Sequence, residues 1–138
     1  MKIEAYLFFD GRAEEAIEFY KRALGAKVEM LMHNKDAPEQ PPPGTLPKGS
    51  ENKVMHSSLM IGDTRVMISD GFNKGKPVFE GFSLSISVKA EAEADRIFAA
   101  LAEGANVEYP FQEYGGNYFG SLVDKFGTQW MVMCTATT

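Results

Sequence analysis

The chain has 138 residues, 44% of them hydrophobic, and a formal net charge of −5. This length suits one ordinary domain with a sizeable core, and the lack of clustered Lys and Arg argues against a nucleic-acid partner. No apolar run reaches the ~18 residues of a membrane-spanning helix, and no signal-peptide pattern opens the chain, so we expect neither membrane insertion nor secretion. The single cysteine, Cys134, excludes an intrachain disulfide and fits a reducing compartment. The sequence therefore predicts a cytoplasmic protein.

The first half of the chain predicts a strand, a helix and three further strands. Residues 2–9 are rich in aromatic and branched side chains, as strands are. A helix begins at Ala13, because apolar residues recur at helical spacing from there, and Gly25 is its expected end. Residues 26–33 form a second strand. Residues 54–70 predict a hairpin that turns at a central Gly-Asp pair.

Residues 34–53 interrupt this pattern with several prolines and two glycines among polar residues. Proline lacks the N–H that a strand needs and fixes φ, so the segment predicts a long loop. We favour a tolerated surface insertion. A lid, a dimer arm or a segment that docks a partner stays open as an alternative.

The second half repeats the order of the first. Ser83, Ser85 and Ser87 alternate with apolar residues, which is typical of a strand with one buried face. The expected elements are a linker over residues 71–81, a strand over 82–88, a helix over 91–103, a short strand over 106–109 that Pro110 ends, and a hairpin over 118–133.

Alignment of the two halves shows an internal repeat. The segment Gly-Ala-Lys-Val-Glu at 25–29 matches Gly-Ala-Asn-Val-Glu at 104–108, an offset of 79 residues. The same offset places the first strand opposite the strand over 82–88. We therefore predict an α+β single domain, residues 1–138, made of two βαβββ modules over residues 1–70 and 82–138.

The residues that make up these modules resemble a known family. The matching motifs are Tyr-Leu-Phe-Phe at 6–9, Glu-Ala-Ile-Glu-Phe-Tyr at 15–20, Leu-Gly-Ala at 24–26, His56, Met-Ile-Ser-Asp at 67–70, Gly-Phe at 81–82, Phe-Gly at 119–120, Asp-Lys-Phe-Gly at 124–127 and Trp-Met at 130–131. Together they resemble the PhnB-like branch of the vicinal oxygen chelate superfamily. That resemblance implies the glyoxalase/bleomycin resistance-like fold, and it implies a homodimer.

The superfamily's usual chemistry uses a divalent metal held by residues of the first and last strands of each module. In this chain the corresponding positions are Glu4 and Tyr6, Ser83 and Ser85, Met67 or Ser69, and Met131 or Met133. Only Glu4 is an ordinary ligand, so we predict no bound metal or other cofactor. A divalent metal held by His56, Glu4 and water stays open as an alternative. We favour a hydrogen-bonded or pocket-lining role for His56.

The remaining prediction concerns a ligand pocket. If the paired modules form a cup, serine hydroxyls and aromatic rings can line it, which suits a small-molecule site. The predicted ligand-binding residues are His56, Tyr6, Ser83, Ser85, Tyr118 and Trp130. For Phe8, Phe119 and Trp130, a place in the core is an equally good interpretation.

The function that we expect is small-molecule binding, with any catalysis unproven. Two alternatives are a metal-dependent lyase, isomerase or resistance transferase acting on a vicinal-oxygen substrate, and a non-catalytic interaction module that uses the proline-rich loop. Relatives in the PhnB-like branch often carry a methyltransferase label. We reject methyl transfer, because it normally needs a doubly wound sheet with a glycine-rich first turn, which this order of elements does not predict.

Overall fold

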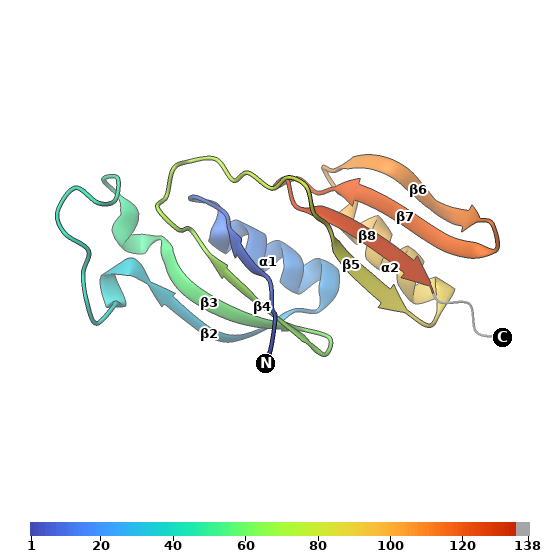
Figure 1. Cartoon of the computed structure of the whole chain (residues 1–138), viewed down its shortest axis with the longest axis horizontal. Helices are drawn as coiled ribbons and strands as arrows, with labels where there is room; N and C mark the ends of the chain where they lie inside the picture. Colours follow the sequence, from blue (N-terminus) through green and yellow to red (C-terminus); the bar gives the residue numbers. More distant parts are fainter. Residues whose placement is uncertain (135–138) are drawn as a thin grey trace. The chain divides into compact units, whose positions relative to one another are not determined.

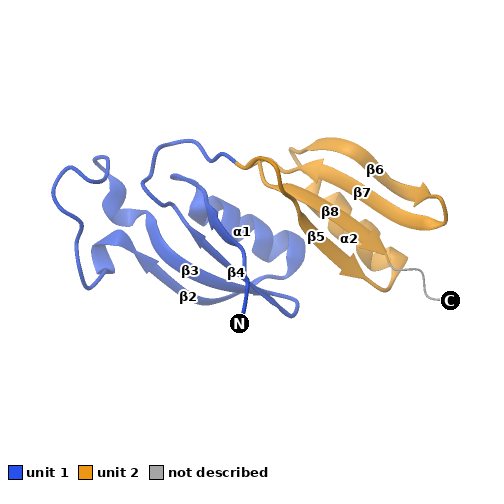
Figure 2. Ribbon diagram, in the orientation of Figure 1, with its two compact units in different colours: residues 1–78 blue, residues 79–138 orange. Residues whose placement is uncertain are grey.

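The computed structural model describes residues 1–134 and divides the chain into two compact units, residues 1–78 and 79–138 (Figure 2). The division falls inside the predicted linker. Each unit consists of a four-stranded sheet with one helix packed on it (Figure 1). Both units follow the order strand, helix, three strands, which confirms the predicted α+β class and the two βαβββ modules.

The first unit has the strand order β1-β4-β3-β2, with β1 parallel to β4 and the other pairs antiparallel. The predicted first strand is shorter than expected, because only three of its residues pair with β4. Two short 3-10 helices flank the proline-rich loop. The elements are β1 (Tyr6–Phe8), α1 (Ala13–Leu24), β2 (Lys27–His33), η1 (Asn34–Asp36), η2 (Ser50–Asn52), β3 (Val54–Ile61) and β4 (Thr64–Ser69).

Features of the sequence explain where helix α1 forms and where it ends. Its buried residues include Ala16, Ile17 and Tyr20, which lie on one face. Gly25 has a φ of 66°, and its N–H donates to the Lys21 carbonyl at 3.1 Å. A left-handed residue directly after the last turn closes the helix with little strain only where it is glycine.

The second unit repeats this arrangement with the strand order β5-β8-β7-β6, in which β5 is parallel to β8. Its hairpin turns at Asp124, whose Oδ1 accepts the N–H groups of Phe126 at 2.9 Å and Thr128 at 3.0 Å. The predicted helix ends two residues earlier than expected. The elements are β5 (Leu84–Val88), α2 (Glu91–Leu101), β6 (Asn106–Tyr114), β7 (Asn117–Val123) and β8 (Gln129–Cys134).

The prediction that Pro110 ends the strand after α2 is wrong. Strand β6 continues through Pro110 to Tyr114, with an irregular register between Tyr109 and Gln112. Because β6 is an edge strand, one of its sides faces no ladder partner in the sheet. A proline at such a position, next to an irregularity, costs the sheet no essential hydrogen bond.

In each sheet the side chains alternate between a face that packs on the helix of that unit and a face that this helix does not cover. In the first unit Leu7, Phe9 and Ile68 are buried, and the Phe9 ring lies 6.1 Å from the Tyr20 ring of α1. In the second unit Gly120 faces α2, because an added Cβ there would lie 2.7 Å from Phe98. We call the opposite, helix-free side the open face of each unit. Within residues 1–134, no helix is long and apolar enough to cross a membrane.

Candidate functional site

The open face of the first unit holds a hydrogen-bonded pair of a tyrosine and a histidine. The Tyr6 hydroxyl on β1 lies 2.8 Å from Nδ1 of His56 on β3, and the two ring centroids are 5.5 Å apart. Strand β4 runs between the two strands, so the pair spans the sheet across one intervening strand. The fold thus joins two residues that are 50 positions apart in the sequence.

Aromatic and apolar side chains border this pair. The Phe8 ring stacks on Tyr6, with centroids 4.8 Å apart and ring planes within 16°. Tyr6 is 37% exposed and Phe8 is 48% exposed, so both rings present surface to the solvent. Met67 of β4 lies directly beside Tyr6 in the parallel register. The pair therefore sits on a partly apolar, partly exposed surface of the first unit.

The hydrogen-bonding capacity of the pair is not used up. A neutral imidazole donates through one nitrogen and accepts through the other, and a phenol both donates and accepts. Because Nδ1 is engaged with Tyr6, Nε2 is the second functional atom of His56, and within residues 1–134 it has no hydrogen-bond partner. The Tyr6 oxygen likewise has room for a second hydrogen bond. The pair can thus make two directed contacts with a ligand.

A second polar group lies further along the same face. Glu29 Oε1 accepts from Arg65 Nε at 3.2 Å and from the Ser58 hydroxyl at 3.3 Å. Both charged side chains are about two-fifths exposed, and ion pairs of that kind contribute little to stability. In the sheet register Ser58 pairs with Met67, which pairs with Tyr6. Met67 therefore lies between Ser58 of this polar group and Tyr6.

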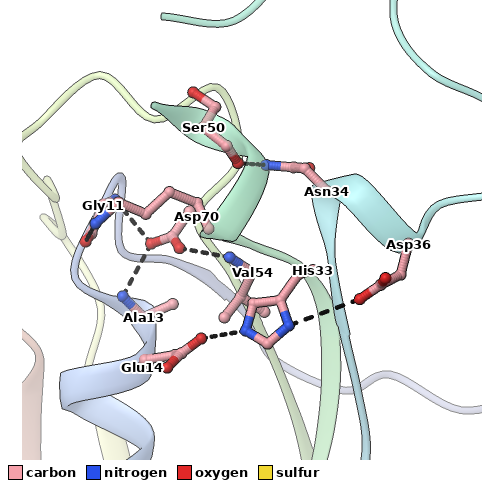
Figure 3. Close-up of polar contacts among 10 residues, drawn as sticks. Gly11, Ala13, Glu14, His33, Asn34, Asp36, Ser50, Val54 and Asp70 are labelled. Atoms are coloured by element: carbon pink, nitrogen blue, oxygen red, sulfur yellow. Dashed lines mark hydrogen bonds and ion pairs between the residues drawn. The ribbon is translucent and has the colours of Figure 1, made fainter. Parts of the chain in front are cut away.

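A buried carboxylate holds the two strands of the pair in place (Figure 3). Asp70 Oδ1 accepts the backbone N–H groups of Gly11 at 2.7 Å and Ala13 at 2.9 Å, and its Oδ2 accepts that of Val54 at 2.8 Å. Asp70 is only 1% exposed. It ties the start of α1, which follows β1, to the start of β3. It is therefore a positioning residue for Tyr6 and His56.

Sequence reasoning did not assign Asp70 this role. The residue entered only as part of a family motif, although an aspartate directly after a strand and ahead of a glycine is a usable signal. Its partners are separated from it by up to 59 positions, a distance at which periodicity gives no information. The link that Asp70 makes between α1 and β3 could have been inferred only once the pairing of the strands was known.

His33 occupies a different cluster, at the base of the proline-rich loop. Its Nε2 is hydrogen-bonded to Glu14 of α1, and its Nδ1 lies 3.9 Å from Asp36 (Figure 3). Beside it, the Asn34 side chain donates to the Ser50 carbonyl at 2.8 Å and closes the neck of the loop. The two carboxylates approach different nitrogens of the ring, so the three side chains do not converge on one point. They anchor the loop and make no metal site.

The donor set of the superfamily's ligand positions does not fit a divalent metal. Glu4 is the one ordinary ligand among these positions. The Tyr6 hydroxyl is hydrogen-bonded to His56, the methionines offer only thioethers, and the serine hydroxyls are weak ligands for a hard cation. Among the residues described, no group of three His, Cys, Asp or Glu side chains could hold a metal ion. We therefore derive no chemistry through a metal.

The other predicted site residues lie in the second unit, and they do not share one face. Ser85 on β5 and Ser83 just before it are exposed. Trp130 is only 3% exposed and donates from Nε1 to Asp124 Oδ2 at 2.8 Å. It pairs with Leu122 on the helix side of the sheet. The interpretation of Trp130 as core, which the sequence left open, is the correct one.

Tyr118 lies on the same side of β7 as Gly120 and stacks against Phe111 at 6.1 Å. The charge of Glu91 is the largest influence that raises the pKa of this phenol, followed by burial and the charge of Glu113. Because Tyr118 lies on the helix side of the sheet, it is not on the open face with Ser83 and Ser85. Of the six predicted residues, the structure brings only Tyr6 and His56 into contact.

These features define a structural class. Two βαβββ units, each with one helix on a mixed four-stranded sheet, make the glyoxalase/bleomycin resistance fold of the vicinal oxygen chelate superfamily. A glyoxylase/bleomycin resistance protein/dioxygenase domain from Frankia sp. EAN1pec superposes with a TM-score of 0.63 at 16% identity, covering 96% of this chain and 93% of that chain. At this identity the match shows the fold alone.

Proteins of higher sequence identity place the chain in one family within this superfamily. A family model described as 3-demethylubiquinone-9 3-methyltransferase matches residues 1–133, so the chain belongs to this PhnB-like family. Protein YjdN of Escherichia coli K12 is 31% identical over 140 residues, 96% of this chain and 94% of that protein. The crystal structure of PA1353 from Pseudomonas aeruginosa is 34% identical with a TM-score of 0.85, over 99% of both chains. A putative 3-demethylubiquinone-9 3-methyltransferase, PhnB protein, from Bacillus cereus is 27% identical with a TM-score of 0.79, over 98% of this chain and 100% of that chain.

The family description names a methyl transfer that the architecture does not support. Methyltransferases of the common type bind their cofactor on a doubly wound parallel sheet with a glycine-rich first turn. In residues 1–134 each sheet contains a single parallel pair, β1 with β4 or β5 with β8. Membership of the family is therefore shown, and an activity is not.

Proposed function

We propose that the protein binds a small organic molecule on the open face of the first unit, with the Tyr6–His56 pair as its polar anchor. The observation that carries this proposal is the 2.8 Å hydrogen bond between two side chains that are both accessible and both have bonding capacity left. Small-ligand sites typically combine mostly apolar surroundings with a few directed polar groups. Phe8 and Met67 supply such surroundings.

The chemistry of the face indicates the class of ligand. The stacked rings of Tyr6 and Phe8 favour a planar or aromatic group, because rings attract one another in offset or edge-on contacts. Nε2 and the Tyr6 oxygen favour a ligand with an oxygen function next to that group. We therefore expect an aromatic or apolar compound that carries a carbonyl, carboxylate or hydroxyl.

Binding is tested by thermal unfolding and by nuclear magnetic resonance (NMR) titration with phenylpyruvate, benzoate and benzyl alcohol. A ligand present at 100 times its Kd stabilises the folded protein by about 2.7 kcal/mol. We expect at least one of the compounds to raise the Tm and to shift the resonances of the first unit. Dialysis against a chelator should leave the effect unchanged, since the anchor contains no metal.

Two substitutions locate the site. Tyr6→Phe and His56→Ala should each weaken binding about tenfold, the loss expected for one hydrogen bond to a ligand. Tyr109→Phe, an exposed tyrosine of the second unit, is the matched control and should bind as the unchanged protein does. If none of the three compounds binds, or if both first-unit variants bind normally, the proposal is wrong.

The proposal extends to assembly and location. We propose a homodimer, which the superfamily resemblance supports, and a cytoplasmic protein, which the single cysteine supports. Analytical ultracentrifugation at micromolar concentration should give twice the 15.2 kDa mass of the chain. A sedimenting species of one chain mass across that range would contradict the dimer and would leave the ligand site unaffected.

A further inference from the structure

The geometry points to a metal site beside the same histidine: we propose that Nε2 of His56 and the thioethers of Met30 and Met32 bind Cu⁺, a soft monovalent cation. This inference goes beyond the proposed function and does not need a bound organic compound. The site also differs from the superfamily's metal positions, which lie on the first and last strands of each module, because its ligands come from β2 and β3.

The second nitrogen of His56 faces the side of the sheet on which the two methionines lie. The ring nitrogens of an imidazole point in diverging directions, and Nδ1 lies 2.8 Å from the Tyr6 hydroxyl on β1. In the strand order β1-β4-β3-β2, strands β1 and β2 lie on opposite sides of β3. Nε2 is therefore turned away from β1 and toward β2, and within residues 1–134 it has no hydrogen-bond partner.

The strand register places both thioethers on that side. Met32 is the direct partner of His56 in the antiparallel ladder, and Met30 pairs with Ser58, two residues further along β3. Directly opposite residues have Cβ atoms about 4.5–5.5 Å apart, and same-face neighbours along one strand are about 6.6 Å apart. Met30 is 41% exposed and Met32 is half-buried, so both flexible side chains have room to turn their sulfur atoms toward Nε2.

The donor set suits Cu⁺ better than a hard divalent ion. Thioether sulfur is a soft ligand that selects Cu⁺, and imidazole nitrogen is also a good copper ligand. All three ligands are neutral. The carboxylate of Glu29, next to Met30 in the sequence, is already bonded to Arg65 and Ser58. The site therefore favours a soft monovalent cation over Zn²⁺ or Mg²⁺.

Tyr6 orients the histidine for this role. A histidine that binds a metal through one nitrogen almost always donates its other N–H to an oxygen or a water, and that contact fixes the ring and its tautomer. The Tyr6 oxygen, 2.8 Å from Nδ1, is in place to accept this hydrogen bond. Tyr6 is thus a positioning residue, which does not touch the ion.

The second unit lacks the same ligands. At the offset of 79 residues, Tyr109 and Phe111 stand where the first unit has its two methionines. Phe119 is the counterpart of the histidine, because it precedes by two residues the serine that pairs with Met131. We therefore expect one ion per chain, bound to the first unit.

The test titrates the full chain with Ag⁺, which has the same ligand preference as Cu⁺, and follows the methyl groups of the eight methionines by NMR. The protein carries Cys134→Ala, because a thiol is itself a soft ligand and Cys134 is the only cysteine. Single Met→Leu variants assign the signals. We expect those of Met30 and Met32 to shift together with the ring of His56 and to saturate at one ion per chain. Anaerobic competition with bicinchoninate then measures the affinity for Cu⁺.

Substitutions test each member of the site. Loss of an outer partner of a metal ligand typically lowers metal affinity about 10–100-fold, so Tyr6→Phe should weaken Cu⁺ binding at least about tenfold. Met30→Leu, Met32→Leu and His56→Ala should each weaken it at least as much. The two methionine changes nearly conserve volume and should fold. Met67→Leu is the matched control, since Met67 lies on the same open face but on β4, and it should bind as the unchanged protein does.

A spectroscopic measurement separates orientation by Tyr6 from a general loss of structure. The ¹⁵N signals of His56 should show Ag⁺ bound at Nε2 in the unchanged protein. In Tyr6→Phe part of the ion should move to Nδ1, which has lost its partner. A loss of structure would not produce this change of nitrogen.

Three results would overturn the inference: Ag⁺ that leaves the signals of Met30 and Met32 unshifted, Cu⁺ affinity that survives both Met32→Leu and His56→Ala, and Zn²⁺ binding as tight as that of Cu⁺. The metal titrations contain no organic compound. Failure of the test compounds to bind therefore counts only against the proposed function, and failure of Cu⁺ to bind counts only against this site.

Discussion

The two units share one architecture and differ in what their open faces offer. In each unit the first strand lies parallel to the last, so Tyr6 beside Met67 corresponds to Ser85 beside Met131. One strand further, Ser58 and Ser121 pair with the same two methionines. Two residues earlier on those strands stand His56 and Phe119. The second unit therefore has a serine and a phenylalanine where the first has the hydrogen-bonded Tyr6 and His56.

The second open face carries aromatic rings in place of that pair. Tyr109, Tyr114 and Phe119 form a cluster in which each pair of ring centroids is 6.2 Å apart. Serine and phenylalanine have no group that titrates, so this face can contact a ligand but has no counterpart of His56. Repetition of a fold thus does not require repetition of its chemistry.

The units also differ in how a buried aspartate is used. Asp70 accepts N–H groups from residues up to 59 positions away, whereas Asp124 accepts from residues two, four and six positions away. The first carboxylate joins separate elements, and the second organises one hairpin. Substitutions at the two positions should therefore have different consequences for the site.

The largest expected effect is that of Asp70→Ala. It leaves three backbone N–H groups without their acceptor, and unsatisfied buried groups cost about 1–3 kcal/mol each. We expect the free energy of unfolding to fall by about 3 kcal/mol or more, measured by urea denaturation. Ligand binding should weaken as well, because β1 and β3 lose their common anchor.

Asp124→Ala is the matched comparison for that prediction. It removes a carboxylate of similar burial from the second unit, so it should also lower the free energy of unfolding. Binding on the first unit should be unchanged at temperatures where the variant is folded. Equal weakening of binding by the two substitutions would contradict the positioning role of Asp70.

The next largest effect is that of replacing the pair by its counterparts from the second unit. Tyr6→Ser combined with His56→Phe removes both hydrogen-bonding groups and the stacked ring beside Phe8. We expect the Kd of a bound aromatic compound to rise more than tenfold, since each lost interaction contributes about 1 kcal/mol. Isothermal titration calorimetry measures it, and an unchanged Kd would show that the two open faces do not differ in this function.

Much of the fold follows from the sequence, because the signals involved are local. Glycine after the last turn marked the end of α1, and strict alternation identified the less exposed side of β5. The internal repeat then gave the order of elements in both units. Pro110 misled, because whether a proline is tolerated depends on a strand's place in the sheet, and its own sequence does not give that place.

The candidate site could be predicted from the sequence only in part. Tyr6 and His56 were both predicted to bind a ligand, but their contact depends on the pairing of β1 and β3 with β4. Trp130 was predicted as a pocket residue, with a place in the core as an equally good interpretation. Its side chain lies on the helix side of β8, whereas that of the neighbouring Met131 lies on the open face. A shift of one residue in a strand exchanges its faces, so pocket residues require the register as well as the pattern.

A smaller effect is expected from the proline-rich loop, which joins β2 to β3 where the second unit uses only Gly115 and Gly116 between β6 and β7. Deletion of residues 41–46 keeps the bonds of the neck, including Asn34 to Ser50 and Gln40 to Asn34. Because loop length affects closure entropy only slowly, the free energy of unfolding should change by less than about 1 kcal/mol. A larger loss on urea denaturation would show that the loop supports the sheet.

The smallest expected effect concerns the phenols of the two units, which have different neighbours. The Tyr6 hydroxyl meets an imidazole, whereas Tyr118 lies near the carboxylates of Glu91 and Glu113, which raise its pKa above 10.0. A negative neighbour disfavours the tyrosinate, so Glu91→Gln should lower the pKa of Tyr118 toward its ordinary value. NMR titration of tyrosine labelled at Cζ measures this shift. Glu113→Gln should give a smaller decrease. A pKa that stays equally raised when Glu91→Gln and Glu113→Gln are combined would mean that these two charges do not set it.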